Sequence, residues 1–310
     1  MEAIVEKILD NVENVIMGKR EVTKDIVKAI IVGGNVLIED IPGIGKTTLV
    51  KALAKSIKID YSRIQFTPDL LPSDITGISV FNQKTMEFEF RKGPIFSNLI
   101  LADEINRTSP KTQAALLQVM EEKQITEDGH TYDLQEPFLV IATENPIEQE
   151  GTFSLPEALL DRFMIRVSIG YVDKQQEINI LKNYKNKSPL EEIKSVVTKE
   201  DILILRKKAN KVYISDELYN YIINIVWATR NNSKIKLGVS TRGAMYLTRL
   251  CQASAAIDGR DYAIPDDVKK NATLVLSHRI MIENRINKSS STKEDIIGEI
   301  INSIKVPRVR

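Results

Sequence analysis

The segment Val36–Thr48 constrains this chain more than any other. It reads as a short β-strand that runs into a glycine-containing loop and then into the first turn of a helix. Backbone N–H groups in such a loop, together with the N-terminus of the following helix, attract phosphate oxygens. The lysine reaches the β- and γ-phosphates, and the hydroxyl after it can bind Mg²⁺. The residues predicted to bind nucleotide here are Gly43, Ile44, Gly45, Lys46, Thr47 and Thr48, with Thr47 also a metal ligand.

The loop departs from the strict phosphate-loop pattern at one position. The pattern G-x-x-x-x-G-K-[ST] has glycine first, and this chain has Asp40 there. Aspartate tolerates a left-handed backbone better than most residues do. The turn therefore remains feasible with Asp40 in it.

Composition sets broad limits on the class of protein. The 310 residues, 43% of them hydrophobic, can bury a substantial core and predict about two domains. A net charge of +1 gives no overall field for nucleic acid or a membrane. The single cysteine, Cys251, fits a reducing compartment. The acid-containing start, Met1–Asp10, does not read as a signal peptide, and no apolar run reaches the roughly 18 residues of a bilayer span. These features predict a cytoplasmic protein.

The first half of the chain alternates helical and strand patterns, as a parallel α/β sheet requires. The predicted helices are Glu21–Val32, Thr47–Ile57 and Lys111–Glu122. The predicted strands are Val36–Glu39, Tyr61–Phe66, Asn98–Ala102, Phe138–Ala142 and Ile165–Ile169. Two further segments, Ser79–Phe90 and Gln124–Leu134, read as hairpins.

The second half reads as helical, with no convincing strand. The predicted helices are Glu177–Tyr184, Lys199–Lys211, Asp216–Arg230, Arg242–Asp258 and Pro265–Leu276, with Asn183–Pro189 as a linker. Within Asp216–Arg230, the helical spacing of Tyr219, Ile223 and Trp227 predicts that they belong to the core of this part. We therefore expect an α/β nucleotide-binding domain over residues 1–186 and a small, all-helical domain over 187–310.

Two acids follow the apolar strand Leu99–Ala102. In an open parallel sheet, ligands bind at the carboxyl ends of the strands. Asp103 would hold the Mg²⁺ hydration shell, and Glu104 would orient and polarise the attacking water. A solvated strand end is the alternative, but the upstream phosphate loop favours the catalytic interpretation.

Asn145 follows another buried strand. A neutral amide beside the γ-phosphate can hydrogen-bond the attacking water without adding charge. Asn145-Pro146 is also a strong turn signal by itself, so a plain turn is the alternative. We favour the sensor role, because this strand could neighbour the strand that ends at Asp103.

Arg162 lies at the end of a short predicted helix, and Arg242 begins a helix of the second half. An arginine inserted into a phosphoryl-transfer site from another subunit contributes about 10³–10⁵ in rate. A surface ion pair is the commoner role of an arginine. The sequence pattern alone does not separate these two residues from the other arginines.

Several long runs resemble the MoxR branch of the AAA+ ATPases, and together they cover nearly the whole chain. They are Arg63–Gly77, Leu101–Arg107, Pro110–Leu117, Gly151–Phe163, Gly259–Val268 and His278-Arg279. Asp40 also occurs in members of this branch. The resemblance implies an AAA+ phosphate-loop sheet domain followed by a helical lid domain.

The resemblance also implies an ATP-driven ring, usually a hexamer, with ATP and Mg²⁺ at the subunit interfaces. Arg162 matches the family's arginine finger and Arg242 its second sensor, so that Arg242 would tie the lid to the phosphates. Arg107 is the second candidate for the arginine that acts on a neighbouring subunit. The Ile16–Gly18 region would lie near the adenine, although Lys19 stands where the family often has glutamine. The two hairpins resemble inserts that project toward the ring pore, and ordinary surface hairpins are the alternative.

Proteins of this branch are similar to chaperones that remodel or activate partners, which often carry a von Willebrand factor A domain. Rival functions are an AAA+ nucleic-acid motor, which the balanced charge does not support, and a weakly hydrolysing, ATP-gated scaffold. An enhancer-type transcription activator is disfavoured because its Gly-Ala-Phe-Thr-Gly-Ala loop is missing. The two histidines, His130 and His278, stand apart from any Cys or acid cluster and do not predict a structural metal site.

Overall fold

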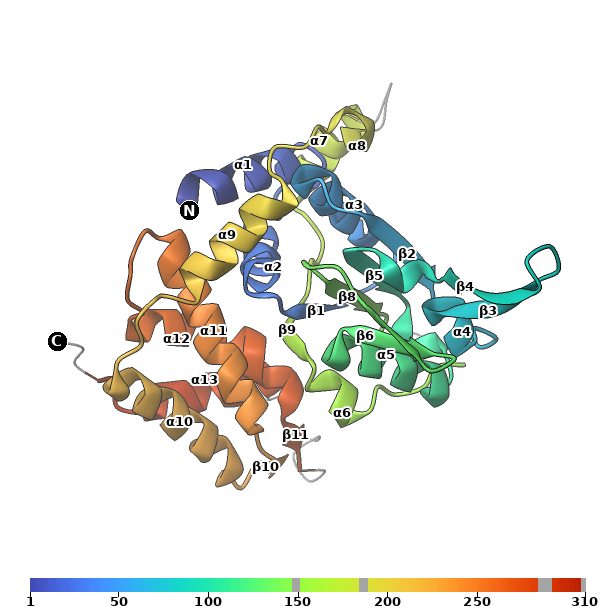
Figure 1. Cartoon of the computed structure of the whole chain (residues 1–310). Helices are drawn as coiled ribbons and strands as arrows, with labels where there is room; N and C mark the ends of the chain where they lie inside the picture. Colours follow the sequence, from blue (N-terminus) through green and yellow to red (C-terminus); the bar gives the residue numbers. More distant parts are fainter. Residues whose placement is uncertain (147–150, 184–188, 284–291, 308–310) are drawn as a thin grey trace.

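A computed structural model describes residues 1–146, 151–183, 189–283 and 292–307, and a five-stranded parallel sheet lies at its centre (Figure 1). The strand order is β2-β5-β8-β1-β9. The bounds are β1 Asn35–Glu39, β2 Tyr61–Gln65, β5 Leu99–Asp103, β8 Leu139–Glu144 and β9 Phe163–Val167. The five predicted strands are confirmed, with each end shifted by two residues or fewer.

The central strands are apolar on both faces because helices cover both sides of the sheet. All five residues of β5 are buried, and so are the first five of β8. Alternate residues of β1 point to opposite faces, so Val36 and Ile38 join one apolar cluster and Leu37 joins the other. Such strands read as continuous hydrophobic runs, which is why the sequence pattern predicts them.

The two faces are covered by different helices. The face of Val36 packs against α1 Glu2–Glu13, α2 Arg20–Val32 and α3 Lys46–Ile57. The face of Leu37 packs against α4 Pro72–Thr76, α5 Pro110–Glu122 and α6 Glu157–Leu160. Local sequence sets where α5 begins, because Ser109 accepts a hydrogen bond from the backbone N–H of Thr112 and Pro110 occupies the first turn.

The C-terminal part is mainly helical, as predicted. Its helices are α9 Lys199–Ala209, α10 Asp216–Arg230, α11 Thr241–Ile257, α12 Pro265–Leu276 and α13 Lys293–Ser303, and α7 Lys174–Asn183 and α8 Pro189–Glu192 precede them. Short helical turns lie at η1 Pro94–Phe96, η2 Ile105–Arg107 and η3 Ser277–Arg279. An antiparallel pair, β10 Ile235–Leu237 and β11 Met281–Ile282, was not predicted, because two or three residues carry no readable period. In the described ranges, no helix is long and apolar enough to cross a membrane.

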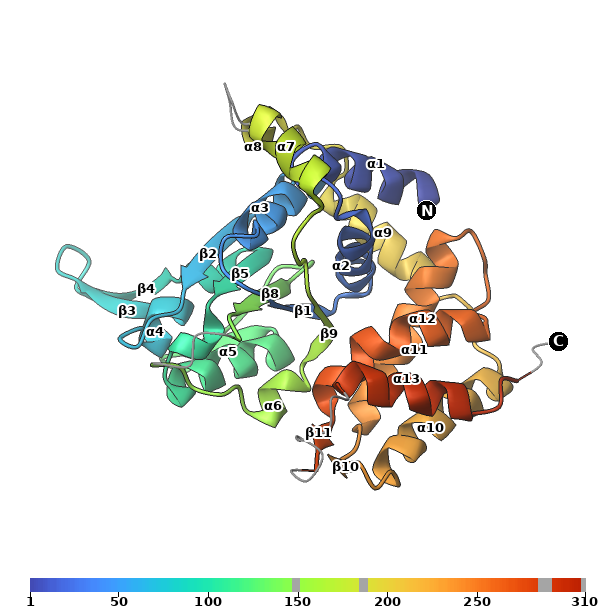
Figure 2. The ribbon, with the colours of Figure 1, turned by 180° about the vertical axis from the view of Figure 1, so that it is seen from behind.

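The lid helices pack on the sheet domain at one end of the sheet. Figure 2 shows that β9 runs from α6, which lies beside the lid, toward α7 at the far end of the sheet domain. Helices α9 and α11 contact α2, and one apolar cluster extends from β1 through α2 into the lid. Most of the predicted linker lies at residues 184–188, outside the described residues, and the domain division at 186/187 stays a prediction.

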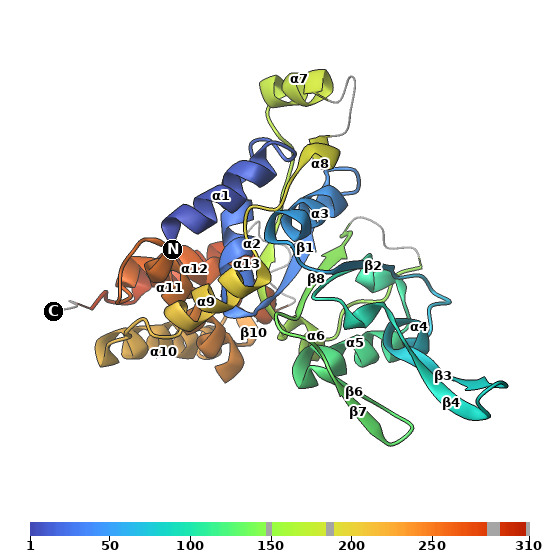
Figure 3. The same ribbon diagram turned by 45° about the horizontal axis from the view of Figure 1, so that its top comes forward.

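Two hairpins project from the body on the side away from the lid (Figure 3). They are formed by β3 Gly77–Asn82 with β4 Glu87–Lys92, and by β6 Gln124–Glu127 with β7 His130–Asp133. Their bases touch, because the ring of Phe90 stacks on the ring of Tyr132 with centroids 4.6 Å apart. Both predicted hairpins are confirmed as hairpins, and their place at a ring pore stays a prediction.

One packing prediction is wrong. Tyr219, Ile223 and Trp227 lie on the solvent face of α10 and are 47%, 41% and 56% exposed. The face of α10 that packs on the lid core carries Leu218, Tyr221, Ile222, Ile225, Val226 and Thr229. Both sets recur at helical spacing, so periodicity alone could not tell which stripe is buried.

Candidate active site

The loop between β1 and α3 has the backbone of an anion-binding site. Gly43 and Gly45 adopt left-handed conformations, with φ of 85° and 91°. Gly45 is the N-cap of α3 and supplies no side-chain cap, so the first N–H groups of the helix face the loop. A Cβ on Gly43 would meet nothing within 4 Å, which leaves its backbone open on that side. This geometry suits a phosphate chain.

The amine of Lys46 lies next to this loop, between the ends of β1 and β8. Its Nζ donates to the carbonyl oxygens of Asp40 and Glu144, which stand just after β1 and at the end of β8. Burial lowers the pKa of Lys46, and the charges of Asp40, Asp103 and Glu104 oppose that shift. The ammonium therefore lies among backbone carbonyls and acids, within the part of the fold that surrounds the loop.

Thr47 and Asp103 meet across the neighbouring elements α3 and β5. The Thr47 hydroxyl donates to Asp103 Oδ2 at 3.3 Å. The same oxygen accepts from Arg63 of β2, at 2.9 Å from Nε and 2.7 Å from the terminal nitrogen. A hydroxyl and a carboxylate are hard oxygen ligands, which fit Mg²⁺. Among the described residues no group of three or more His, Cys, Asp or Glu could hold a metal by itself, and Mg²⁺ usually completes its shell with water and phosphate oxygens.

Glu104 takes a conformation that few non-glycine residues adopt. Its φ is 58°, in the left-handed region, directly after β5. Its backbone N–H donates to the Thr143 hydroxyl at 2.9 Å, and its carboxylate accepts from Gln65 at 2.8 Å. Arg107 Nε lies 3.1 Å from the same carboxylate oxygen. Arg107, which the sequence offered as a second candidate for a trans-acting arginine, is thus paired within its own chain.

Thr143 of β8 links the two acids. Its hydroxyl donates to Asp103 Oδ1 at 2.6 Å while it accepts the N–H of Glu104. Asn145 follows β8 and is 6% exposed, and its carbonyl accepts from Asn106 at 3.5 Å. β8 lies between β5 and β1, so the fold brings five predicted site residues together at the carboxyl ends of these parallel strands. They are Lys46, Thr47, Asp103, Glu104 and Asn145.

Asp40 has a different role from the one its position in the motif suggests. Its φ is not positive, so the tolerance of aspartate for a left-handed backbone is not needed at this position. Its buried carboxylate instead accepts four hydrogen bonds, from the Ser168 hydroxyl and from the N–H groups of Ile41, Ile169 and Gly170. Burial raises the pKa of Asp40, but these hydrogen bonds outweigh it and leave the pKa below its ordinary value.

Gly18, predicted near the base, lies next to the phosphate loop and beneath α7. A Cβ on Gly45 would lie 3.3 Å from Cδ1 of Ile16, so the segment at residues 16–18 borders the loop. A Cβ on Gly18 would lie within 2.5 Å of the Gln176 amide, and Gly18 has a φ of 70°. The left-handed backbone therefore favours glycine here, and a larger residue would also displace the end of the Gln176 side chain.

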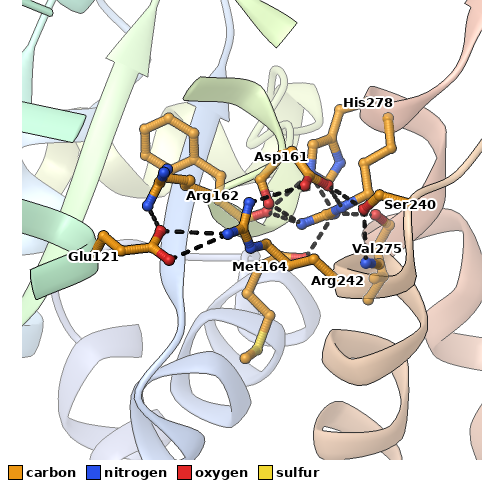
Figure 4. A network of polar contacts seen from close by, with 11 residues as sticks. Glu121, Asp161, Arg162, Met164, Ser240, Arg242, Val275 and His278 are labelled. Atoms are coloured by element: carbon orange, nitrogen blue, oxygen red, sulfur yellow. Dashed lines mark hydrogen bonds and ion pairs between the residues drawn. The ribbon is translucent and has the colours of Figure 1, made fainter. Parts of the chain in front are cut away.

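Arg162 and Arg242 lie at the end of the strands opposite to the phosphate loop. Figure 4 shows both side chains beside Glu121 and Asp161. Arg162 directly precedes β9, whose Phe163 pairs with Asn35 at the start of β1, while the phosphate loop follows the end of β1. The length of such a strand is about 13 Å. Arg162 forms an ion pair with Glu121 of α5, and Arg242 binds Glu121 at 3.2 Å and Asp161 at 3.1 Å.

The expectation that Arg242 ties the lid to the phosphates of its own chain is therefore wrong. The lid packs against α2 and α6, and α11 begins beside α6 rather than beside the phosphate loop. The sequence motif identifies the arginine but contains no information on where the lid docks. In this chain Arg242 shares its carboxylate partner, Glu121, with Arg162.

A third arginine completes this cluster. Arg279 is 1% exposed in its side chain and binds Asp161 Oδ1 at 3.0 Å, together with the carbonyl oxygens of Asp161 and Phe163. Three arginines thus share the two carboxylates Glu121 and Asp161. Burial lowers the pKa of Arg162, and the nearby charge of Arg242 lowers it further, as expected where positive charge is in excess.

Sequence reasoning missed the side chains that hold the two acids in place, Arg63, Gln65 and Thr143. Arg63 and Gln65 face the acids from β2, and Thr143 faces them from β8. Their polar side chains near strand ends were the available signal. Pairing across strands depends on sheet order, which no local spacing reveals.

The chain resembles known proteins both in sequence and in structure. Two family models match, "ATPase family associated with various cellular activities (AAA)" over residues 35–165 and "AAA lid domain" over residues 227–300. An uncharacterized Bacillus subtilis protein, YeaC, is 47% identical over 99% of this chain and 96% of its own length. Chaperone MoxR1 of Mycobacterium tuberculosis is 34% identical over 98% of this chain and 83% of its own. A crystal structure from Cytophaga hutchinsonii, provisionally described as an ATPase, has a TM-score of 0.91 at 40% identity and covers 99% of this chain and 96% of its own.

Proposed function

The chain belongs to the MoxR family of AAA+ ATPases, and on this premise we propose that it hydrolyses ATP with Mg²⁺ in a ring of identical subunits. One observation supports the proposal most directly. The side chains suited to binding and cleaving a phosphate chain meet at the carboxyl ends of the strands. The cationic cluster of Arg162, Arg242 and Arg279 lies at the opposite, amino ends. Each subunit would then supply half of two different sites.

Binding would use the loop and the first turn of α3. The N–H groups of the loop and the amine of Lys46 hold the phosphate oxygens, and Lys46 leaves its two carbonyl partners to do so. Thr47 and Asp103 would hold Mg²⁺, which, when bound, neutralises phosphate charge. Arg63 fixes the orientation of the Asp103 carboxylate through two contacts to one oxygen.

Cleavage would rest on Glu104 and Asn145. Glu104 orients and polarises the attacking water, and its carboxylate is kept in place by Gln65 and Arg107. Asn145, at the end of the adjacent strand, hydrogen-bonds the same water without adding charge. A positioned base of this kind contributes about 10²–10⁴ in rate.

The arginines would act on the ATP of the neighbouring subunit. Because Arg162 and Arg242 lie at the sheet edge opposite to the loop, their own phosphates are out of reach. Three arginines that share two carboxylates leave a positive excess, which the charge developing on a transferring phosphoryl group would balance. In this scheme Arg162 is the arginine finger, and Arg242 of the same subunit also acts on the neighbouring ATP.

A contact between two different surfaces is head-to-tail, and it forms a ring when the rotation from one subunit to the next closes. We propose a hexamer that remodels or activates client proteins, including clients with a von Willebrand factor A domain. The description of a relative as a chaperone supports a remodelling role. The hairpins β3–β4 and β6–β7 would face the pore, and the exposed side chains of Met86 and Phe88 would touch the client there.

The proposal is tested with Glu104→Gln. We expect ATP affinity to stay close to that of the wild type while turnover falls by about 10²–10⁴. Glu122→Gln, an exposed position on α5, is the matched control and should keep full turnover. Unimpaired turnover in Glu104→Gln would remove Glu104 from the mechanism. Slow wild-type turnover at every protein concentration would favour the ATP-gated scaffold instead.

A further inference from the structure

The carboxylate of Asp40 joins two parts of the fold that are far apart in sequence. One oxygen accepts the N–H of Ile41 at 2.9 Å, inside the phosphate loop. The other accepts the Ser168 hydroxyl at 2.8 Å and the N–H groups of Ile169 and Gly170 at 2.6 and 2.7 Å. With 8% of its surface exposed, Asp40 is a buried tie between the loop and the chain that leaves β9.

This tie cannot be explained by the needs of the loop itself. The left-handed turns of the loop fall at Gly43 and Gly45, and position 40 needs no glycine. Glycine at position 40 can adopt the same backbone conformation. It would remove the acceptor for three backbone N–H groups and the Ser168 hydroxyl, and one of these N–H groups belongs to Ile169, which is only 4% exposed.

The tied segment leads directly to the wall beside the loop. We define the base-side wall as residues 16–19 together with residues 169–176. Its two halves are joined by a hydrogen bond from Lys19 Nζ to the Tyr171 carbonyl at 2.8 Å, and by Gln176 lying on Gly18. Both halves border the phosphate loop, through Ile16 against Gly45 and through Asp40. A nucleoside whose phosphates occupy the loop would have this wall as its neighbour.

We propose that Asp40 is a positioning residue whose carboxylate fixes the base-side wall relative to the phosphate loop, so that ATP binds to both at once. The proposal rests on the proposed function and adds a second role to the loop. The backbone carbonyl of Asp40 accepts the phosphate-binding Lys46, while its side chain holds the segment on which α7 begins. Preorganising both surfaces reduces the ordering cost of binding.

The test compares Asp40→Gly, which restores the strict motif, with Asp40→Asn. Amide hydrogen exchange of Ile169 and Gly170 is measured without nucleotide, and ATP affinity is measured by equilibrium titration. We expect Asp40→Gly to speed exchange of both amides and to weaken ATP binding by about tenfold or more, since these two N–H groups and that of Ile41 lose their acceptor. Asp40→Asn keeps one acceptor oxygen and should fall between Asp40→Gly and the wild type.

Asp267→Asn is the matched control. Asp267 is also buried, accepts the N–H of Ile264 and binds Arg260, but it lies in the lid at the start of α12. It should lower stability without weakening ATP binding. The proposal is overturned if Asp40→Gly binds ATP as tightly as the wild type, if the exchange of Ile169 and Gly170 is unchanged, or if Asp267→Asn weakens binding as much as Asp40→Asn. Failure of the wild type to bind ATP would instead refute the proposed function, because the exchange measurement needs no nucleotide.

Discussion

Thr143 is the side chain on which the geometry of both acids depends. It is fully buried, donates to Asp103 at 2.6 Å and accepts the N–H of Glu104 at 2.9 Å. In Thr143→Val, the methyl groups keep the packing while both hydrogen bonds disappear. We expect turnover to fall by about tenfold or more, because Glu104 loses the contact that fixes its left-handed backbone.

The control for this prediction is Thr229→Val. Thr229 is equally buried and also accepts a backbone N–H, that of Val239, but it donates to the Val226 carbonyl instead of a carboxylate and lies in the lid. Both variants should lose similar free energy of unfolding in urea, about 1–3 kcal/mol for the N–H left without an acceptor. Equal turnover in the two variants would show that Thr143 has a purely structural role.

Glu144 predicts a pH dependence of stability. Burial raises its pKa to about 7, and the charge of Glu39 adds to this, while Arg166 and Lys293 oppose it. The folded state therefore binds its proton more tightly than the unfolded state, where the pKa is near 4.5. The contribution of Glu144 to stability is complete below pH 4.5 and is lost as the pH rises toward 7.

Glu144→Gln should remove this loss. We expect the free energy of unfolding of Glu144→Gln, relative to the wild type, to increase between pH 5 and pH 8, because only the wild type must then ionise a buried carboxyl. Urea unfolding at several pH values gives the measurement, with the exposed Glu87→Gln as the comparison. A difference that stays constant over this range would show that Glu144 is not protonated in the folded protein.

The chemistry-bearing residues could be predicted where they follow directly from a motif or a strand end. Lys46 and Thr47 come with the phosphate loop, and Asp103 and Glu104 come with the buried strand before them. Asp40 shows the limit of this reasoning. The motif defines its position in the loop, but three of the four partners of its carboxylate lie about 130 residues away and depend on the pairing of β9 with β1.

At the scale of secondary-structure elements, Asp161 links α6, α11 and η3. It follows α6 and binds Ser240 at the start of α11, Arg242 in its first turn, and Arg279 of η3. Asp161→Ala would leave the buried Arg279 without its carboxylate. We expect a loss of about 3–5 kcal/mol in the free energy of unfolding. Urea denaturation measures it.

Asp258→Ala gives the contrast. Asp258 pairs with Arg260 at 3.2 Å but its side chain is 47% exposed, so its loss should cost about 1 kcal/mol or less. If the two variants were equally stable, the lid would not depend on Asp161 for its attachment to the sheet domain.

Helices and strands could be predicted where the hydrophobic residues of a segment follow a single periodicity and form one apolar face. It failed for α10, where two apolar stripes compete and only the docking of α11 and α13 decides which one is buried. It also missed α13, although Thr292 and Asp295 form a capping box there that marks a helix start. The small pair β10–β11 is held by tertiary context and leaves no local signal.

At the scale of the whole molecule, the phosphate loop and the arginine cluster lie at opposite ends of the strands of one sheet. The sequence predicted the parallel sheet and the lid, and both are present. The expectation from the family resemblance that Arg242 ties the lid to the phosphates failed, because the docking of the lid is set by contacts of α9 and α11 with α2, far from any motif. With Arg242 in that position, the proposed function assigns both arginines to the ATP of a neighbouring subunit.

The most direct test mixes two variants that are each inactive. Arg162→Ala keeps an intact phosphate edge, and Glu104→Gln keeps an intact arginine edge. In mixed rings about a quarter of the interfaces would join the two intact halves. Mixing Lys46→Ala with Glu104→Gln, which damage the same edge, should give no activity. We predict that ATP hydrolysis returns when Arg162→Ala and Glu104→Gln are combined, and a mixture as inactive as its separate components would contradict the account.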